Sequence, residues 1–319
     1  MSDASSKPTE AYEARFALGI DVGGTKIAGG IVDLANGHVH GRCQLPTDSH
    51  RRGTAVLADV LNLARDLRSE ALSLNLEVSS LGVCVAELVD DSGRVFSDHR
   101  IRWTGLGAHD QFSALMPTTI SSDVRAAALA EARLGAGRGV RDFYFVTVGT
   151  GIAGVLVLDS VPYLGSRGGA LVIANGKERH RCPACGHQYG GMIEDVASGP
   201  ALAAAFGVST AEEVLAAAKS GDRAALAAIE HATGELGRVL ALLANSLDPA
   251  KMVIGGGLGC APGAYFDALS ESIKGGLWEG ISSSMIVTQA TMGPDAGLIG
   301  AAISTDSHIR TNKETRESN

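Results

Sequence analysis

The chain has 319 residues, of which 45% are hydrophobic and 19% charged, and its formal net charge at pH 7 is -8. That length and apolar content suffice for two globular domains. The acidic balance, without a block of lysine or arginine, argues against a nucleic-acid partner or a membrane-surface role. No stretch reaches the roughly 18 consecutive apolar residues of a spanning helix, and the N-terminus lacks the pattern of a secretory signal. We therefore expect a cytoplasmic protein.

The first part of the chain alternates predicted strands and helices. Residues 16–33 read as two apolar strands joined by a glycine turn, which is typical of a hairpin. Residues 53–72 carry apolar side chains at helical spacing, and residues 79–89 read as a buried strand. A further helix is predicted to begin at Ser122 or Asp123, because either side chain can cap its first turn.

Residues 142–159 repeat the opening theme of strand, glycine turn and strand. Two glycine-bent hairpins in two halves of one chain indicate a duplicated α/β domain facing a shared cleft. The remaining predicted elements are helices at 197–207, 211–219 and 223–246, a strand with a glycine turn at 251–259, and a closing helix at 296–305.

This order of elements predicts two domains. A small N-terminal α/β domain is expected over residues 15–123, and a large C-terminal α/β domain over residues 124–295. The closing helix at about 296–305 is expected to pack back on the first domain. The polar segments 1–14 and 306–319 are predicted to be disordered tails.

Three glycine loops follow predicted strands and carry the clearest chemical signal. Glycines expose backbone N–H groups, and a threonine hydroxyl and a lysine charge in the first loop add further donors for phosphate. The first loop has neither the spacing of a P-loop nor that of a dinucleotide fingerprint, and taken alone it would also suit a tight hairpin. The predicted phosphate-binding residues are Gly23, Gly24, Thr25 and Lys26, then Gly149, Thr150 and Gly151, and the bare backbone of Gly256 and Gly257 is predicted to lie against an adenosine.

The motifs, taken in order, resemble the ROK family of repressors, open reading frames and sugar kinases. The resemblance covers roughly residues 16–304. Its matching parts are the DVGGTK loop, Trp103, Asp123 followed by AAALAE, the GTGI loop, the CxxCG segment leading to Glu194 and SGPAL, and the IGGG loop. It implies the actin-like (RNase H-like) α/β fold, with two domains around a central cleft for ATP and substrate. A homodimer is also expected.

The resemblance implies an ATP-dependent phosphotransferase acting on a hydroxyl of a sugar or sugar-like polyol, with Mg²⁺ as cofactor. Asp123 stands at the position of the family's general base, where a carboxylate orients the hydroxyl and accepts its proton. Taken by itself, the same residue could serve only as a helix cap. The implied substrate-facing residues are Ser122, Asn175 and Glu194, although Glu194 could equally be a charge favoured at a helix N-terminus.

The chain departs from the family pattern around the substrate. Relatives carry Glu-x-Gly-His where this chain has Val172 and, three residues later, Asn175. The usual Asn before the catalytic aspartate is Ser122, and the usual Pro-Gly after the GVCV strand is Ala86-Glu87. A side chain that hydrogen-bonds a substrate hydroxyl discriminates strongly against substrates that lack this hydroxyl. An amino sugar or a C7-cyclitol is therefore favoured over glucose.

The family's zinc segment is altered as well. Relatives use the signature histidine and three cysteines, whereas Met192 occupies the third cysteine position here. Two interpretations stay open: free thiols, or a tetrahedral Zn²⁺ site completed by nearby histidines. The candidate ligands are Cys182, Cys185, His180 and His187.

Three other functions fit parts of the sequence pattern. A glucokinase-like hexose kinase would need the lost hydroxyl contacts to come from other residues. A repressor would need a DNA-binding helix-turn-helix before the first glycine loop, where only about fifteen polar residues stand. A catalytically weak sugar sensor would explain the altered signature but gives no reason to keep Asp123 and both phosphate loops.

Overall fold

The computed structural model describes residues 15–47, 51–173, 179–181, 183–186, 188–282 and 284–306. The two segments predicted to be tails lie outside these ranges, except for residue 306. Within the described ranges, no single helix is long and apolar enough to cross a membrane, although the bent pair Gly199–Phe206 and Ala211–Lys219 passes that test by length and composition when its two helices are combined.

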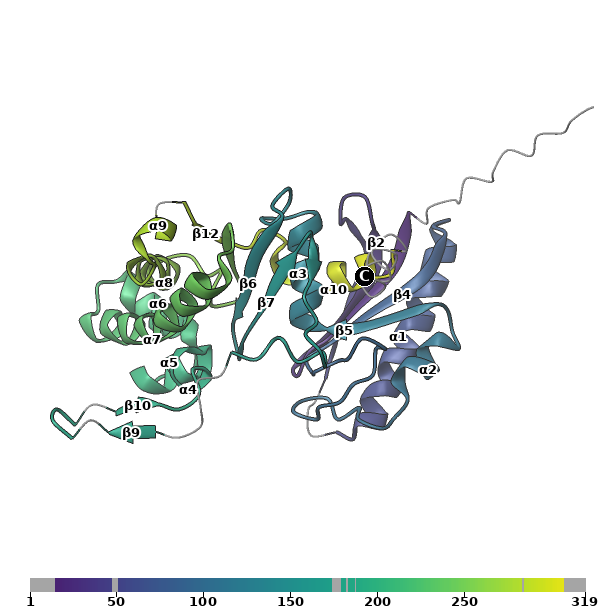
Figure 1. Cartoon of the computed structure of the whole chain (residues 1–319). Coiled ribbons are helices and arrows are strands. Elements are labelled where there is room, and N and C mark those ends of the chain that lie inside the picture. Colours follow the sequence, from purple (N-terminus) through teal and green to yellow (C-terminus); the bar gives the residue numbers. More distant parts are fainter. Residues whose placement is uncertain are drawn as a thin grey trace, which may run out of the picture.

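One lobe is built on a five-stranded sheet with strand order β3-β2-β1-β4-β5. Strand β1 pairs antiparallel with β2 and parallel with β4, and β4 pairs parallel with β5. Helices α1 (Gly53–Ser73) and α2 (Ala108–Ser113) cover its outer face (Figure 1). The strands are β1 (Phe16–Val22), β2 (Lys26–Asp33), β3 (Val39–Pro46), β4 (Val78–Val85) and β5 (Thr118–Ser122).

The other lobe is built on a second five-stranded sheet with order β12-β11-β6-β7-β8, in which β6 and β7 form the expected hairpin. Its strands are β6 (Asp142–Val148), β7 (Ile152–Leu158), β8 (Val161–Pro162), β11 (Lys251–Gly255) and β12 (Ile286–Gln289). A small hairpin is formed by β9 (Arg179–Arg181) and β10 (Gln188–Gly190). The helices are α4 (Glu194–Ala197), α5 (Gly199–Phe206), α6 (Ala211–Lys219), α7 (Arg223–Leu247), α8 (Ala264–Gly275) and α9 (Glu279–Ser282).

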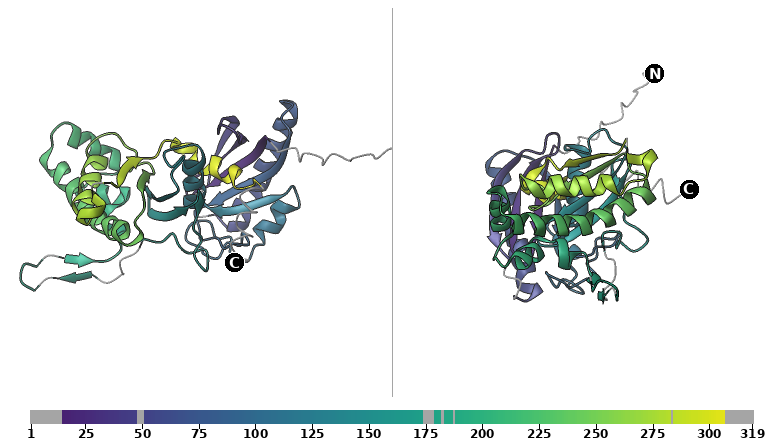
Figure 2. Two further views of the ribbon diagram at one scale, coloured as in Figure 1. Left: turned by 45° about the horizontal axis from the view of Figure 1, so that its top comes forward. Right: turned by 90° about the vertical axis from the view of Figure 1, so that its left-hand side faces the viewer.

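Helices α3 (Asp123–Arg133) and α10 (Ala296–Ile303) lie between the two sheets, as the views in Figures 1 and 2 show. Helix α10, preceded by the 3₁₀ turn Gly293–Asp295, packs on α3, β1 and β4, and α3 packs on β7. Glycine makes this close approach possible, because a Cβ on Gly82 would lie 1.8 Å from the Ala301 carbonyl oxygen and one on Gly300 would lie 1.7 Å from that of Ala126. The closing helix is thus part of the first lobe's inner face.

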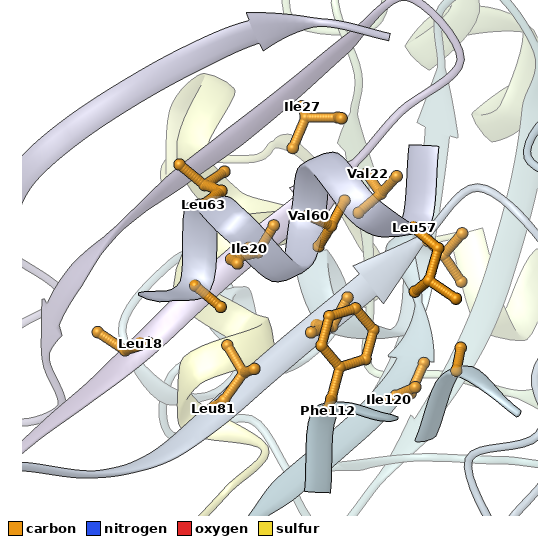
Figure 3. Packing of buried hydrophobic residues seen from close by; sticks show 14 of the residues in the cluster. Leu18, Ile20, Val22, Ile27, Leu57, Val60, Leu63, Leu81, Phe112 and Ile120 are labelled. Carbon is orange, nitrogen blue, oxygen red and sulfur yellow. The ribbon is translucent and has the colours of Figure 1, made fainter. Parts of the chain in front are cut away.

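Each lobe has its own apolar core. In the first, the face of α1 that carries Leu57, Val60 and Leu63 packs on the sheet, together with Phe112 of α2 (Figure 3). In the second, α7 and α8 bury their apolar faces against β6 and β11. Burial of these side chains stabilises each lobe, and each lobe holds its glycine loops in place.

A buried carboxylate joins α3 to the segment that leads into α10. Glu131 is fully buried and accepts the backbone N–H groups of Ala136 at 2.7 Å, Thr291 at 2.8 Å and Met292 at 2.7 Å. A buried carboxylate with several donors is held firmly in place. Glu131 therefore couples the C-terminal end of α3 to the chain that returns to the first lobe.

The predicted elements are present, with one clear error in their bounds. The strand expected over 79–89 ends at Val85, because the N–H of Glu87 turns back to the Val85 carbonyl at 2.7 Å and Val89 forms only an isolated bridge with Val95. The elements that were not predicted are the strands β3, β5, β8, β9, β10 and β12 and the helices α2, α4, α8 and α9. The exact division into domains at 123/124 and 295 stays a prediction.

Candidate active site

The first lobe presents two carboxylates, Asp21 and Asp123, at one edge of its sheet. Val22, Val85 and Ser122 lie side by side in the registers of the parallel strands β1, β4 and β5. Asp21 therefore lies close to the start of α3, where Asp123 is the first helical residue. Parallel strands place their carboxyl ends at one edge, which is where open α/β sheets bind ligands.

Asp123 is not the cap of its helix. The side-chain oxygen of Ser122 accepts the N–H of Arg125 at 3.4 Å and fills the N-cap position. From the described residues, Asp123 accepts a hydrogen bond only from the N–H of the next residue, Val124, at 2.7 Å, and its side chain is half-buried. The capping role thus belongs to Ser122, which is itself buried, and most of the Asp123 carboxylate is left for other contacts.

The surroundings of Asp123 bring the pKa of its carboxyl close to neutral. Desolvation, together with the charges of Asp21 and Glu87, raises the pKa of Asp123 from 3.8 to about 7. Burial also raises the pKa of Asp21, although a hydrogen bond from the Cys84 thiol at 3.3 Å and the charge of Lys26 oppose that rise. A carboxyl with a pKa near the working pH suits general base catalysis.

Activity that depends on Asp123 as a base should therefore follow its ionisation. We expect kcat/KM to rise with pH through about 7 and to level off above it, because only the carboxylate can accept a proton. Asp21→Asn removes a neighbouring negative charge, so the rising limb should move to lower pH even if the rate falls. A profile that stays flat between pH 5.5 and 9 in the unmodified protein would contradict the assignment.

The first glycine loop connects β1 to β2 next to this cluster. The N–H of Gly23 bonds to the carbonyl of Lys26 at 2.9 Å, and the Thr47 hydroxyl donates to the Gly23 carbonyl at 2.7 Å. The N–H of Thr47 donates to the carbonyl of Thr25 at 3.0 Å, which braces the loop from β3. The side chains of Thr25 and Lys26 are exposed, so the loop can offer them to an anion.

The second and third loops lie together in the other lobe. Gly149 bonds to the carbonyl of Gly151 at 2.9 Å, and the N–H groups of Leu258 and Gly259 both bond to the carbonyl of Val148 at 3.0 Å. This contact follows from the parallel pairing of β6 with β11. The structure thus brings the predicted GTGI and IGGG loops side by side at one edge of the second sheet. Thr150 stands at the tip of the GTGI loop.

Two neighbouring glycines of the third loop should respond differently to substitution. Gly256 has φ +83°, and a Cβ there would lie 2.4 Å from the Val148 carbonyl oxygen, whereas a Cβ on the exposed Gly257 would meet nothing within 4 Å. We expect Gly256→Ala to lower the free energy of unfolding by about 1–3 kcal/mol. Gly257→Ala should leave stability unchanged and weaken nucleotide binding. Thermal unfolding and calorimetric titration with a nucleotide check both results, and equal stability losses would contradict this account.

Glu194, one of the residues predicted to face the substrate, lies beside the GTGI loop, as does Val172. Glu194 begins α4, is partly buried, and accepts the N–H of Ile152 at 3.0 Å, so it supports the loop from the side. Val172 forms an isolated bridge with Ala153, and 59% of its surface is exposed. Its neighbours Leu171 and Ile173 are buried. The side chain that stands in place of the family glutamate therefore points away from the core.

Several predicted residues lie outside the described ranges. These are Asn175 among the substrate residues and Cys182 and His187 among the zinc ligands; for His180 only the backbone, in β9, is described. Cys185 is an exposed free thiol. In the parts of the chain that the structure describes, no three His, Cys, Asp or Glu residues form a metal-binding group. The zinc hypothesis stays open. The zinc content of the parent protein and of the Cys182→Ser/Cys185→Ser variant, both purified without chelator, tests it.

Two contributors to the site were missed from sequence. Asp21 lies within the DVGGTK motif, and a carboxylate inside an otherwise apolar strand is a usable signal for a functional residue. Glu87 stands out in the sequence only as a departure from the family pattern. A cavity of about 480 Å³, lined in part by Asp90, Arg125 and Pro162, is lined by none of the predicted site residues that the structure describes.

Comparison with known proteins agrees with this architecture. A ROK family model matches residues 17–307. The chain is 26% identical over 314 residues to a glucokinase from Halalkalibacterium halodurans, covering 90% of this chain and 93% of that protein. It is 30% identical over 294 residues to an N-acetylmannosamine kinase from Haemophilus influenzae, covering 89% and 93%.

A solved structure shows the same arrangement of the two lobes. A ROK family glucokinase from Streptomyces griseus, in complex with glucose and AMPPNP, superposes with a TM-score of 0.76 at 27% identity, covering 92% of this chain and 99% of that one. The fold is thus the actin-like ATPase fold of the sugar kinases. With the family model matching nearly its whole length, the chain belongs to the ROK family.

Proposed function

We propose that the protein is an ATP-dependent kinase that phosphorylates a hydroxyl of a sugar or sugar-like polyol. The observation that carries this proposal is Asp123: a half-buried carboxyl with a pKa near 7, free of the capping role, next to the glycine loop of β1. The similar glucokinase and N-acetylmannosamine kinase support the reaction class. The solved relative that holds glucose and AMPPNP supports ATP as the donor.

In the proposed reaction, the oxygen of the acceptor hydroxyl bonds to the terminal phosphorus of ATP, and Asp123 accepts the proton of that hydroxyl. The bond from that phosphorus to the bridging oxygen breaks, and ADP leaves. The loops of Gly24 and Gly149 hold the phosphates in line from opposite lobes, and Gly257 leaves room for the adenosine. Catalysis of this kind depends on positioning and on stabilising the charge of the transferred group.

The residues at the site fit a magnesium ion. The charge of Asp21 raises the pKa of Asp123, and the only side-chain hydrogen bond made to Asp21 among the described residues comes from the Cys84 thiol. Carboxylate oxygens are the ligands that Mg²⁺ prefers, and a cation there relieves the repulsion. Asp21 is the residue we assign to hold it, directly or through water. The ion neutralises phosphate charge when bound.

For the acceptor, we infer an amino sugar or C7-cyclitol in preference to glucose. Val172 presents an exposed apolar surface beside the GTGI loop, where relatives carry a glutamate that receives sugar hydroxyls. A hydroxyl pressed against valine loses water without gaining a partner. Glu194 keeps a polar contact for the acceptor, and Asn175 is assigned to receive the group that the family histidine would contact.

A panel of hexoses, amino sugars and cyclitols, each tested with ATP and Mg²⁺ for ADP and phosphate-ester formation, tests the proposal. We expect turnover with at least one acceptor and a higher kcat/KM for an amino sugar or cyclitol than for glucose. Preference for glucose would support the glucokinase-like alternative. Saturable binding of an acceptor without any ester formation would support the sugar-sensor alternative and contradict a kinase.

A further inference from the structure

A loop of the first lobe is tied to the end of β4 by a single buried carboxylate. The side chain of Glu87 is buried and accepts the backbone N–H groups of His99 at 3.0 Å, Arg100, and Ile101 at 2.8 Å. The Ser97 hydroxyl donates to the same carboxylate. Four donors on one carboxylate make a strongly charge-assisted contact. The path of residues 97–101 is therefore set by Glu87, ten or more residues upstream.

This path places Arg100 against the first glycine loop. A Cβ built on Gly24 would lie 3.3 Å from Cδ, 3.8 Å from Cγ and 3.7 Å from Cβ of Arg100, so the aliphatic stem covers one side of the loop. Arg100 is exposed, and within the described residues its guanidinium makes no hydrogen bond or ion pair. An arginine with unused donors thus stands beside the loop that is assigned to phosphate.

Two exposed cations favour an anion at this place: Lys26 in the first glycine loop and Arg100 beside it. The nearby carboxylates Asp21, Glu87 and Asp123 oppose an anion, so a second cation next to Lys26 is needed to offset them. A terminal phosphate carries more charge than one cation offsets, and a guanidinium presents a planar fork of N–H donors that matches two phosphate oxygens. Such donors act on the charge that develops in phosphoryl transfer.

We propose that Arg100 binds the non-bridging oxygens of the terminal phosphate of the nucleotide, and that Glu87 is the positioning residue that holds Arg100 there. The proposal rests on the proposed kinase function and adds a residue that the glycine loops do not supply. Glu87 acts on Arg100 only through the backbone of residues 99–101, because its carboxylate oxygens are already occupied by that loop.

Calorimetric titration with AMPPNP and with ADP, both with Mg²⁺, tests this without turnover. We expect Arg100→Gln to weaken AMPPNP binding by about tenfold or more and ADP binding by less than about threefold, because only AMPPNP carries the third phosphate. Arg100→Lys should recover part of the loss. The matched control is Arg138→Gln, an exposed arginine beyond the far end of α3, which should bind both nucleotides like the parent.

A double-variant cycle tests the positioning role. Glu87→Gln should weaken AMPPNP in preference to ADP, and Glu87→Gln/Arg100→Gln should be no weaker than Arg100→Gln alone, because both changes remove one contact. Additive losses, or equal losses for AMPPNP and ADP, would overturn the proposal and leave Glu87 a structural residue. Parent protein that binds neither nucleotide would instead overturn the kinase function itself.

Discussion

Asp123→Asn is expected to lower kcat by a factor on the order of 10² to 10⁴, the usual contribution of a positioned general base. The amide keeps the size of the carboxyl, and its oxygen can still accept the N–H of Val124. Ser122 remains the helix cap, so the start of α3 is preserved. Steady-state turnover with the best acceptor of the panel, at pH 8 and saturating ATP, measures the loss.

The control for this variant is its stability and its nucleotide binding. Because the pKa of Asp123 is raised from 3.8 to about 7 in the folded protein, ionisation costs stability as the pH rises across that interval. The asparagine variant avoids this cost, so its Tm at pH 8 should equal or exceed that of the parent. Asp59→Asn, at a surface ion pair with Arg51, is the matched substitution and should leave kcat unchanged. A parent-like rate for Asp123→Asn would remove Asp123 from the mechanism.

The second large effect concerns substrate choice, and it follows from the exposed Val172. Val172→Glu restores a carboxylate that can accept a hydrogen bond from a substrate hydroxyl. It places no charge in the core, because 59% of the valine is already exposed. We expect the ratio of kcat/KM for glucose over the preferred amino sugar or cyclitol to rise by about 10- to 100-fold, as a partner for a buried hydroxyl contributes about 1–3 kcal/mol. Competing acceptors at equal concentration with ATP and Mg²⁺ give this ratio directly.

Val172→Leu is the matched apolar control and should leave the preference unchanged. Val172→Glu combined with Asn175→His should move the preference further toward glucose, since both family positions are then restored. If the unmodified protein prefers glucose over every amino sugar and cyclitol tested, the interpretation of the altered signature is wrong, and another residue must supply the contact.

The parts of the site that could be predicted are those that depend on short local sequence patterns. The loops at Gly23, Gly149 and Gly256 follow apolar strands, and a helix after Asp123 is marked by its cap and its alanines. The structure confirms the hairpins and the helix, and it adds that Gly256 needs its positive φ. Local backbone requirements of this kind leave a direct trace in the sequence.

Features that depend on distant partners could not be predicted. Glu87 reads as a charged residue after a strand, and only the folded loop at residues 97–101 shows what its carboxylate holds. The pKa of Asp123 depends on Asp21, which lies about a hundred residues earlier and reaches it through the pairing of β1, β4 and β5. Strands β5 and β12 were missed because they are short and partly polar, so their neighbours decide their conformation.

The most direct test of the account is ³¹P NMR of ATP, Mg²⁺ and the best acceptor, with the parent protein and the Asp123→Asn variant side by side. The account predicts that the parent converts the terminal phosphate of ATP into a phosphate monoester only when the acceptor is present, and that the variant binds ATP yet forms the ester at least about a hundredfold more slowly. Ester formation at the parent rate by Asp123→Asn, or release of inorganic phosphate without any ester by the parent, would contradict it.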